Sequence, residues 1–263
     1  MELTPVVSSA ILIAIGLLPS LIWMSFFMRE DCHPEPKYLV IKTFLMGIVI
    51  APLAILLQYG FCQMIGSNCL IGASNAGFVL WAALVEELVK FYAIVIIVLK
   101  SPEFDEPMDG MIYMITAALG FAAIENILFM FKIIPGGDVF NASSSQALIA
   151  LETIGLRSLG ATILHALSSA IIGYFLAMAW FYQHHKKKLI IMGIVIGTMF
   201  HFAFNIFISN QEALAGLGLS LGLLVFMSFL VYILFNKVRD RHEKAKAARL
   251  AMAIGRQPIF LVK

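Results

Sequence analysis

Long apolar stretches separated by short polar loops dominate the chain. An apolar stretch of about 20 residues is long enough to cross a bilayer as a helix. By this criterion the pattern predicts seven membrane-spanning helices, at about residues 5–28, 38–61, 76–99, 108–134, 158–182, 189–208 and 213–236. Because the connections are short and no repeat or soluble domain stands apart, we expect an all-α polytopic bundle over residues 1–236, followed by a basic cytoplasmic tail over residues 237–263.

The composition agrees with a membrane protein. Apolar residues make up 61% of the 263 and charged residues only 13%, whereas a soluble domain carries about 25% charged residues. The chain has no phosphate-binding loop and no basic, aromatic-rich pattern, so we expect the lipid bilayer and not nucleic acid as its surroundings. No basic segment precedes the long first stretch, which indicates a retained helix rather than a cleaved signal peptide.

Positive charge is concentrated in alternate loops and in the tail. The loop 184–188 contains three lysines, and the tail from Lys237 onward is basic, whereas the loops near residues 62–75 and 135–145 carry little positive charge. The positive-inside rule therefore predicts an outer N-terminus and a cytoplasmic C-terminus. Residues 146–157 predict a short outer amphipathic helix, either on the membrane or solvated in the loop. Cys62 and Cys69 share a predicted outer loop, where a disulfide is permitted.

Four of the predicted spans carry polar residues that are unusual for a membrane helix. These are Glu86, Glu87 and Lys90 in the third, Glu125 and Asn126 in the fourth, His165 in the fifth, and His201 and Asn205 in the sixth. At about 1.5 Å per residue, Glu86 and Glu125 lie about 15 and 14 Å inside the outer ends of their spans, and the two histidines about 11 Å. Ionisable residues at such depth mark functional sites by default.

Simpler explanations exist for each residue taken alone. Lys90 follows Glu86 by one helical turn and Glu87 by three residues, so a structural salt bridge explains that turn. A single membrane histidine or asparagine often serves only as a hydrogen-bond partner between helices. The convergence of four helices in one layer favours a site instead.

The residue types suit hydrolysis by an activated water molecule. A buried glutamate serves as a general base or acid, and a histidine orients the water. His201 and Asn205, one turn apart, predict a pair of donors to an oxyanion. Glu86, Glu125, His165 and His201 also suit zinc by ligand type. The metalloprotease pattern His-Glu-x-x-His is absent from the sequence, so we expect neither metal nor cofactor.

The motifs Glu86-Glu87-x-x-Lys90 and Phe121-x-x-x-Glu125-Asn126, with His165 and His201, resemble the PrsW family of glutamic intramembrane proteases, which is related to the CAAX-protease and bacteriocin-processing group. The resemblance implies a multi-pass enzyme of a prokaryotic cell membrane that cleaves a membrane-anchored protein, the named case being an anti-sigma factor. It also implies that Glu86 activates water and that His201 and Asn205 form the oxyanion hole.

One position departs from the related group, whose Phe-x-x-x-His is here Phe121-x-x-x-Glu125, so either Glu125 or His165 supplies the second water contact. The predicted catalytic residues are Glu86, Glu87, Glu125, His165, His201 and Asn205. Three alternatives stay open: a metal-dependent protease on the same residues, a proton-coupled transporter or channel, and a non-catalytic receptor or scaffold. Transporters usually show repeats or broken helices, and the sequence shows neither.

Overall fold

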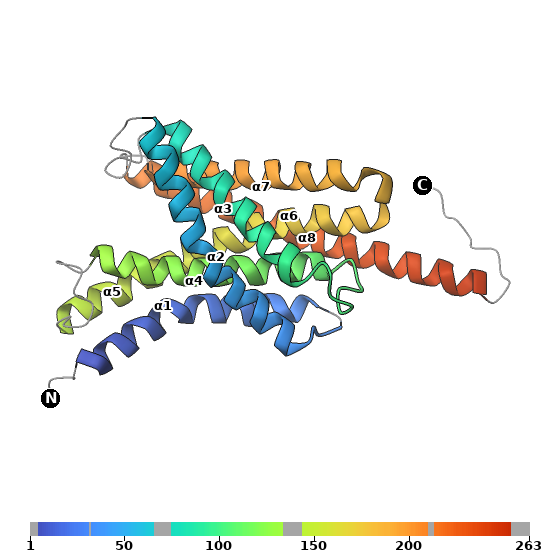
Figure 1. Ribbon diagram of the computed structural model, residues 1–263, viewed down its shortest axis with the longest axis horizontal. Coiled ribbons are helices and arrows are strands. Elements are labelled where there is room, and N and C mark those ends of the chain that lie inside the picture. The colour runs from blue at the N-terminus through green and yellow to red at the C-terminus, as the bar shows by residue number, and fades with distance from the viewer. Residues whose placement is uncertain (1–4, 32, 66–74, 134–143, 210–212, 254–263) are drawn as a thin grey trace.

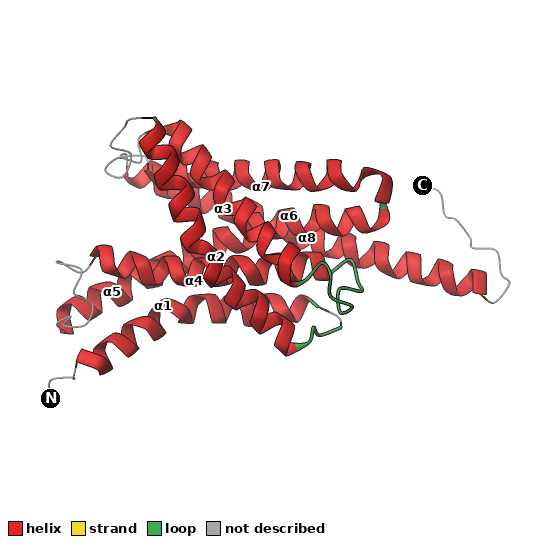
Figure 2. Cartoon of the chain, viewed as in Figure 1, coloured by secondary structure: helices red, strands yellow, loops and turns green. Residues whose placement is uncertain are grey.

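The described part of the molecule is entirely helical (Figures 1 and 2). The computed structural model describes residues 5–31, 33–65, 75–133, 144–209 and 213–253. Its helices are α1 (Pro5–Phe27), α2 (Lys37–Met64), α3 (Ala76–Ile97), α4 (Asp109–Ile133), α5 (Ser144–Arg157), α6 (Ile163–Phe181), α7 (Lys186–Ser209) and α8 (Ala213–Ala253). No strand occurs within these ranges, so the predicted all-α class is confirmed.

Each predicted span corresponds to one helix, and α5 is the short helix expected before the fifth span. Within the described ranges, six segments are long and apolar enough to cross a membrane: Ile13–Glu30, Lys37–Met64, Asp109–Met130, Glu152–Phe181, Gln183–Ser209 and Ala215–Ala253. The remaining predicted span, over residues 76–99, corresponds to α3. This helix has 22 residues but carries three ionisable side chains near its centre. Its first turn is capped by Asn75, whose side chain accepts hydrogen bonds from the N–H groups of Gly77 and Phe78.

Three expectations stay predictions: the boundary between bundle and tail, the direction of the chain across the membrane, and the pairing of Cys62 with Cys69. α8 continues without a break through residue 237, so the division between bundle and tail falls inside one helix (Figure 1). The direction of the chain across the membrane is likewise still inferred from its charges. Cys62 is buried and disulfide-bonded, whereas Cys69 lies outside the described residues, so their pairing is also still a prediction.

α4 and α6 form the centre of the bundle, and the other helices pack around them. In the 18-residue apolar windows of the candidate spans of α4 and α6, 72% and 83% of the residues are buried, against 22% in that of α8. Large apolar side chains such as Val49, Leu56 and Phe229 point outward, whereas the ionisable residues of α3 are buried. Apolar surface and polar interior together are the arrangement expected in lipid, where ionisable groups face the inside of the bundle.

α2 crosses α4 with the two backbones in contact (Figure 1). A Cβ atom on Gly47 would lie 2.1 Å from the carbonyl oxygen of Ala117, and one on Gly120 would lie 2.0 Å from that of Phe44. Neither position has room for a side chain. This crossing fixes the separation of α2 and α4, and the polar residues described next lie on one side of it.

Candidate active site

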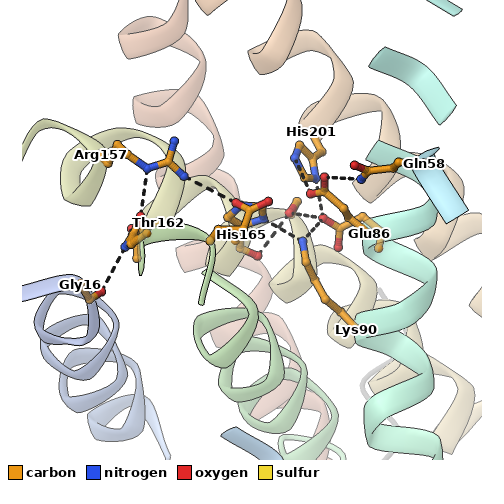
Figure 3. A network of polar contacts seen from close by, with 12 residues as sticks. Gly16, Gln58, Glu86, Lys90, Arg157, Thr162, His165 and His201 are labelled. Carbon is orange, nitrogen blue, oxygen red and sulfur yellow. Dashed lines mark hydrogen bonds and ion pairs between the residues drawn. The ribbon is translucent and has the colours of Figure 1, made fainter. Parts of the chain in front are cut away.

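α3, α6 and α7 bring Glu86, Glu87, Lys90, His165 and His201 together inside the bundle (Figure 3). All five are buried, and Glu87 and Lys90 are completely inaccessible. The rings of His165 and His201 pack edge to face with their centroids 4.9 Å apart. The expected meeting of residues from separate helices is therefore present in the structure.

Glu87 is the acceptor at the centre of this cluster. Its Oε1 atom receives hydrogen bonds from Lys90 Nζ at 2.8 Å and Ser168 Oγ at 2.9 Å, and lies 2.8 Å from His201 Nδ1. Its Oε2 atom receives a hydrogen bond from Ser169 Oγ at 2.9 Å. Since a carboxylate only accepts, the His201 ring donates its Nδ1–H to Glu87, and a neutral ring then has a free lone pair at Nε2.

Glu86 faces that nitrogen with an unsatisfied oxygen. Gln58 of α2 donates a hydrogen bond from Nε2 to Glu86 Oε1 at 3.0 Å. The other oxygen, Oε2, is buried and has no hydrogen-bond partner among the described residues, and it lies 3.5 Å from His201 Nε2. A buried polar atom without a partner calls for a specific role. Glu86 and His201 thus present two acceptors side by side.

Glu125 and His165 form a second pair. His165 Nε2 lies 2.8 Å from Glu125 Oε2, and His165 Nδ1 lies 2.8 Å from Lys90 Nζ. An ammonium group can only donate, so Lys90 donates to Nδ1 and the ring donates its Nε2–H to Glu125. Arg157, the last residue of α5, lies 3.6 Å from the same Glu125 oxygen.

A cavity of about 380 Å³ gives access to these groups. Its lining residues are Ala51, Ala54, Ile55, Gln58, Glu86, Phe121, Glu125, Leu128, Phe129, Arg157, Ala161, Leu164, His165, His201 and Asn205. α2 contributes one wall, with residues that follow Gly47 in the chain, and α4 and α5 contribute the opposite wall. Of the predicted site residues, Glu86, Glu125, His165, His201 and Asn205 line the cavity, whereas Glu87 lies behind it.

The donor set fits a metal ion only in part. One ligand atom each of Glu86, His165 and His201 lies within 4.8 Å of the others. The free Nε2 of His201, supported by Glu87, and the unpartnered Glu86 oxygen are suitable ligands. His165 is not, because its Nε2 atom carries the proton donated to Glu125 while Lys90 occupies Nδ1. Three protein ligands are usual for catalytic zinc, and this hydrogen bonding supplies two.

Besides Lys90, for which the sequence indicated only a salt bridge, the network around the cluster contains four side chains that were not among the predicted site residues: Gln58, Arg157, Ser168 and Ser169. Gln58 directly follows the uninterrupted apolar run 44–57 of α2, which was a usable signal. The two serines adjoin His165 in sequence but gain their role only from Glu87 on another helix. Arg157 ends an amphipathic helix, where a basic residue is ordinary.

Comparison with known proteins adds the family. Residues 35–234 match the family described as PrsW family intramembrane metalloprotease. The protein named Protease PrsW of Geobacillus kaustophilus is 28% identical over 202 residues, which cover 76% of this chain and 81% of the relative. Protease PrsW of Bacillus subtilis is 26% identical over 242 residues, which cover 90% of this chain and 95% of the relative. No solved structure matches the chain.

Proposed function

Because the chain belongs to the PrsW family of intramembrane proteases, we propose that it hydrolyses a membrane-anchored protein with a water molecule activated by Glu86. The family and the six apolar helices make it a multi-pass protein of the bacterial cell membrane. One observation carries the mechanism: Glu86 lines the cavity, and its Oε2 atom is buried and without a partner among the described residues, 3.5 Å from His201 Nε2.

In this mechanism the two acceptors hold one water molecule. The water donates one hydrogen to Glu86 Oε2 and the other to His201 Nε2, which leaves its oxygen lone pair directed at the peptide carbonyl carbon. Glu86 takes the proton as the oxygen adds to that carbon, and the carbonyl becomes a tetrahedral oxyanion. The C–N bond then breaks, and Glu86 returns the proton to the leaving nitrogen.

The remaining residues orient these groups. Glu87 fixes the His201 ring through Nδ1, and Gln58 fixes the Glu86 carboxylate through Oε1. A neutral His201 held in this way accepts at Nε2. In this proposal it takes the second water contact, which the sequence analysis assigned to Glu125 or His165, and it does not donate to the oxyanion. Asn205, which also lines the cavity one turn further along α7, supplies the amide donor to the oxyanion.

The cavity walls support a membrane-anchored substrate. Ile55 of α2 and Leu128 of α4 line the cavity and are both well exposed. Apolar walls suit an extended segment at the end of a transmembrane helix, because the segment leaves lipid for a surface of similar polarity. An anti-sigma factor is the substrate that the family resemblance implies.

The proposal is tested by comparing wild type with Glu86→Gln. Single-span membrane proteins of the host, tagged at both ends, are co-expressed with either form, and cleavage products are mapped by mass spectrometry. We expect products with wild type and with the exposed control Glu152→Gln, and none with Glu86→Gln, because an amide cannot accept the proton. Cleavage by Glu86→Gln at the wild-type rate would exclude Glu86 as the base.

A metal-dependent protease on the same residues is the second candidate, favoured by the grouping of Glu86, His165 and His201. A metal there would supply Lewis-acid polarisation and a more acidic bound water. Purified protein treated with a chelator separates the two candidates. The glutamate mechanism predicts unchanged cleavage and no stoichiometric metal, whereas loss of cleavage that zinc restores would favour the metal.

A further inference from the structure

Arg157 reaches the cavity from outside the motifs that define the site. It is the last residue of α5, and its side chain is 21% exposed. Figure 3 shows its guanidinium between the active-site cluster on one side and α1 on the other. A guanidinium that is largely buried is costly unless its donors find partners, so the partners that it has are informative.

Three contacts hold the guanidinium in one orientation. Its Nε donates to Asn126 Oδ1 at 3.0 Å, and its central carbon lies 4.4 Å from the centre of the Phe129 ring. Its Nη2 then lies 3.6 Å from Glu125 Oε2. The planar group is therefore fixed by an amide and a ring, and its Nη2 forms an ion pair with the Glu125 carboxylate.

Asn126 is itself firmly anchored. It is completely buried, and its Nδ2 donates to Thr162 Oγ1 at 3.1 Å and to the carbonyl oxygen of Gly16 at 3.5 Å. Thr162 ends a π-helical turn, Ser158–Thr162, which separates Arg157 from α6. Such turns are rare and occur frequently at functional sites. Here the turn allows Arg157 and Thr162 to reach the same asparagine.

Glu125 connects this anchor to the catalytic groups. Its Oε2 atom is approached both by Arg157 and, at 2.8 Å, by His165 Nε2. We propose that Arg157 is a positioning residue: it holds the Glu125 carboxylate against His165 Nε2 and thereby keeps in place the ring whose hydrogen-bond direction Lys90 sets. The inference rests on the proposed function, since it assigns the Arg157 side chain a part in the same reaction.

The competing explanation is that Arg157 only ties α5 to α4. Such a tie acts through Asn126 and Phe129 and does not depend on Glu125. The two explanations differ in one measurable way. A positioning residue loses its effect when Glu125 is already neutral, whereas a tie between helices loses the same amount with or without the carboxylate.

A double-mutant cycle measures this dependence. Wild type, Arg157→Gln, Glu125→Gln and the double variant are purified in detergent and assayed on the tagged single-span reporter that wild type cleaves and Glu86→Gln does not. We expect Arg157→Gln to lower kcat by up to about 10²-fold, the loss expected when a group beside the reacting atoms is displaced by about 1 Å. KM should stay within about twofold, because in this proposal Arg157 acts through Glu125 and not by contacting the substrate in the cavity that it lines. Arg157→Lys keeps the charge but not the planar guanidinium, so its kcat should lie between those of wild type and Arg157→Gln.

The double variant decides the cycle. We expect its kcat within about twofold of Glu125→Gln alone. A kcat equal to the product of the two single effects would overturn the inference and leave Arg157 as a tie between helices. Thermal unfolding of each variant shows whether the lost activity follows lost folding, and Arg157→Lys gives the comparison if Arg157→Gln folds poorly.

A spectroscopic readout is independent of cleavage. In protein labelled with ¹⁵N-histidine, the His165 signals are assigned by their loss in His165→Asn. We expect the Nε2 signal to shift in both Arg157→Gln and Glu125→Gln, and to stay unchanged in Arg239→Gln, whose arginine pairs with Glu30 elsewhere. An unchanged signal in Arg157→Gln would overturn the inference even if the enzyme is active. If wild type cleaves no reporter, the proposed function fails, and this signal still decides the role of Arg157.

Discussion

Lys90→Met is expected to destabilise the bundle through Glu87 and not through Glu86. Helical spacing leaves both glutamates within reach of Lys90, but its Nζ atom lies 2.8 Å from Glu87 Oε1, and both side chains are completely buried. Removing the ammonium leaves the Glu87 carboxylate buried with three neutral donors: His201, Ser168 and Ser169.

The size of the effect follows from this geometry. Two unit charges 2.8 Å apart attract by about 6 kcal/mol at an effective dielectric constant of about 20. Removing one partner of a buried pair costs about 3–5 kcal/mol. Because the other donors to Glu87 remain, we expect Lys90→Met to lower the free energy of unfolding by about 3 kcal/mol. Glu87→Gln should recover most of this loss, since no buried charge is then left alone and only the Lys90 hydrogen bond to His165 Nδ1, worth about 1 kcal/mol, stays lost.

The assay is unfolding by SDS titration in mixed micelles, followed by tryptophan fluorescence. The matched comparison is Lys90→Met with Glu87→Gln against Lys90→Met with Glu86→Gln. We expect the first double variant within about 1 kcal/mol of wild type and the second no more stable than Lys90→Met alone. The pairing would be refuted by recovery with Glu86→Gln, or by a Lys90→Met protein as stable as wild type.

Three further outcomes can be measured on the same preparations. Gly47→Ala should lose about 1–3 kcal/mol of unfolding free energy, because its Cβ would lie 2.1 Å from the carbonyl oxygen of Ala117, whereas Gly60→Ala on the same helix, with nothing within 4 Å, should lose none; equal stability of the two variants would contradict the tight crossing. Asn205→Ala should slow reporter cleavage by about 10²–10³-fold without loss of folded protein, and an unchanged rate would remove the oxyanion role. Burial raises the pKa of Glu35 above its ordinary value of 4.5, so the folded protein binds that proton more tightly than the unfolded chain does. The free energy of unfolding therefore falls as the pH rises from 4.5 through the raised pKa of the folded protein. In Glu35→Gln that fall should be smaller, and an identical pH dependence would show that Glu35 does not contribute.

The helices could be predicted from the sequence because lipid leaves the backbone little choice. An apolar stretch that crosses a bilayer must satisfy its own N–H and C=O groups, which makes it a helix. The cost of ionisable side chains in lipid identified the central polar residues. Glu86, His165 and His201 interrupt apolar helices, which indicates that they meet inside the bundle.

The partners of these residues depended on the tertiary structure. Along α3 alone, Lys90 reaches Glu86 and Glu87 equally well, and the choice follows from the positions of Ser168 and His201 on two other helices. The rotation of each helix about its axis, set by backbone contacts such as that at Gly47, decides which side chains face one another.

The residues that the sequence analysis missed have the same explanation. Gln58 and Arg157 belong to no motif, and each gains its place only because α2 and α5 lie against the cluster. Periodicity and composition report the environment along one helix, where neighbours are three or four residues apart. Contacts between helices join residues far apart in the chain. Only the tertiary structure therefore shows that Glu125 pairs with His165 and that one oxygen of Glu86 has no hydrogen-bond partner among the described residues.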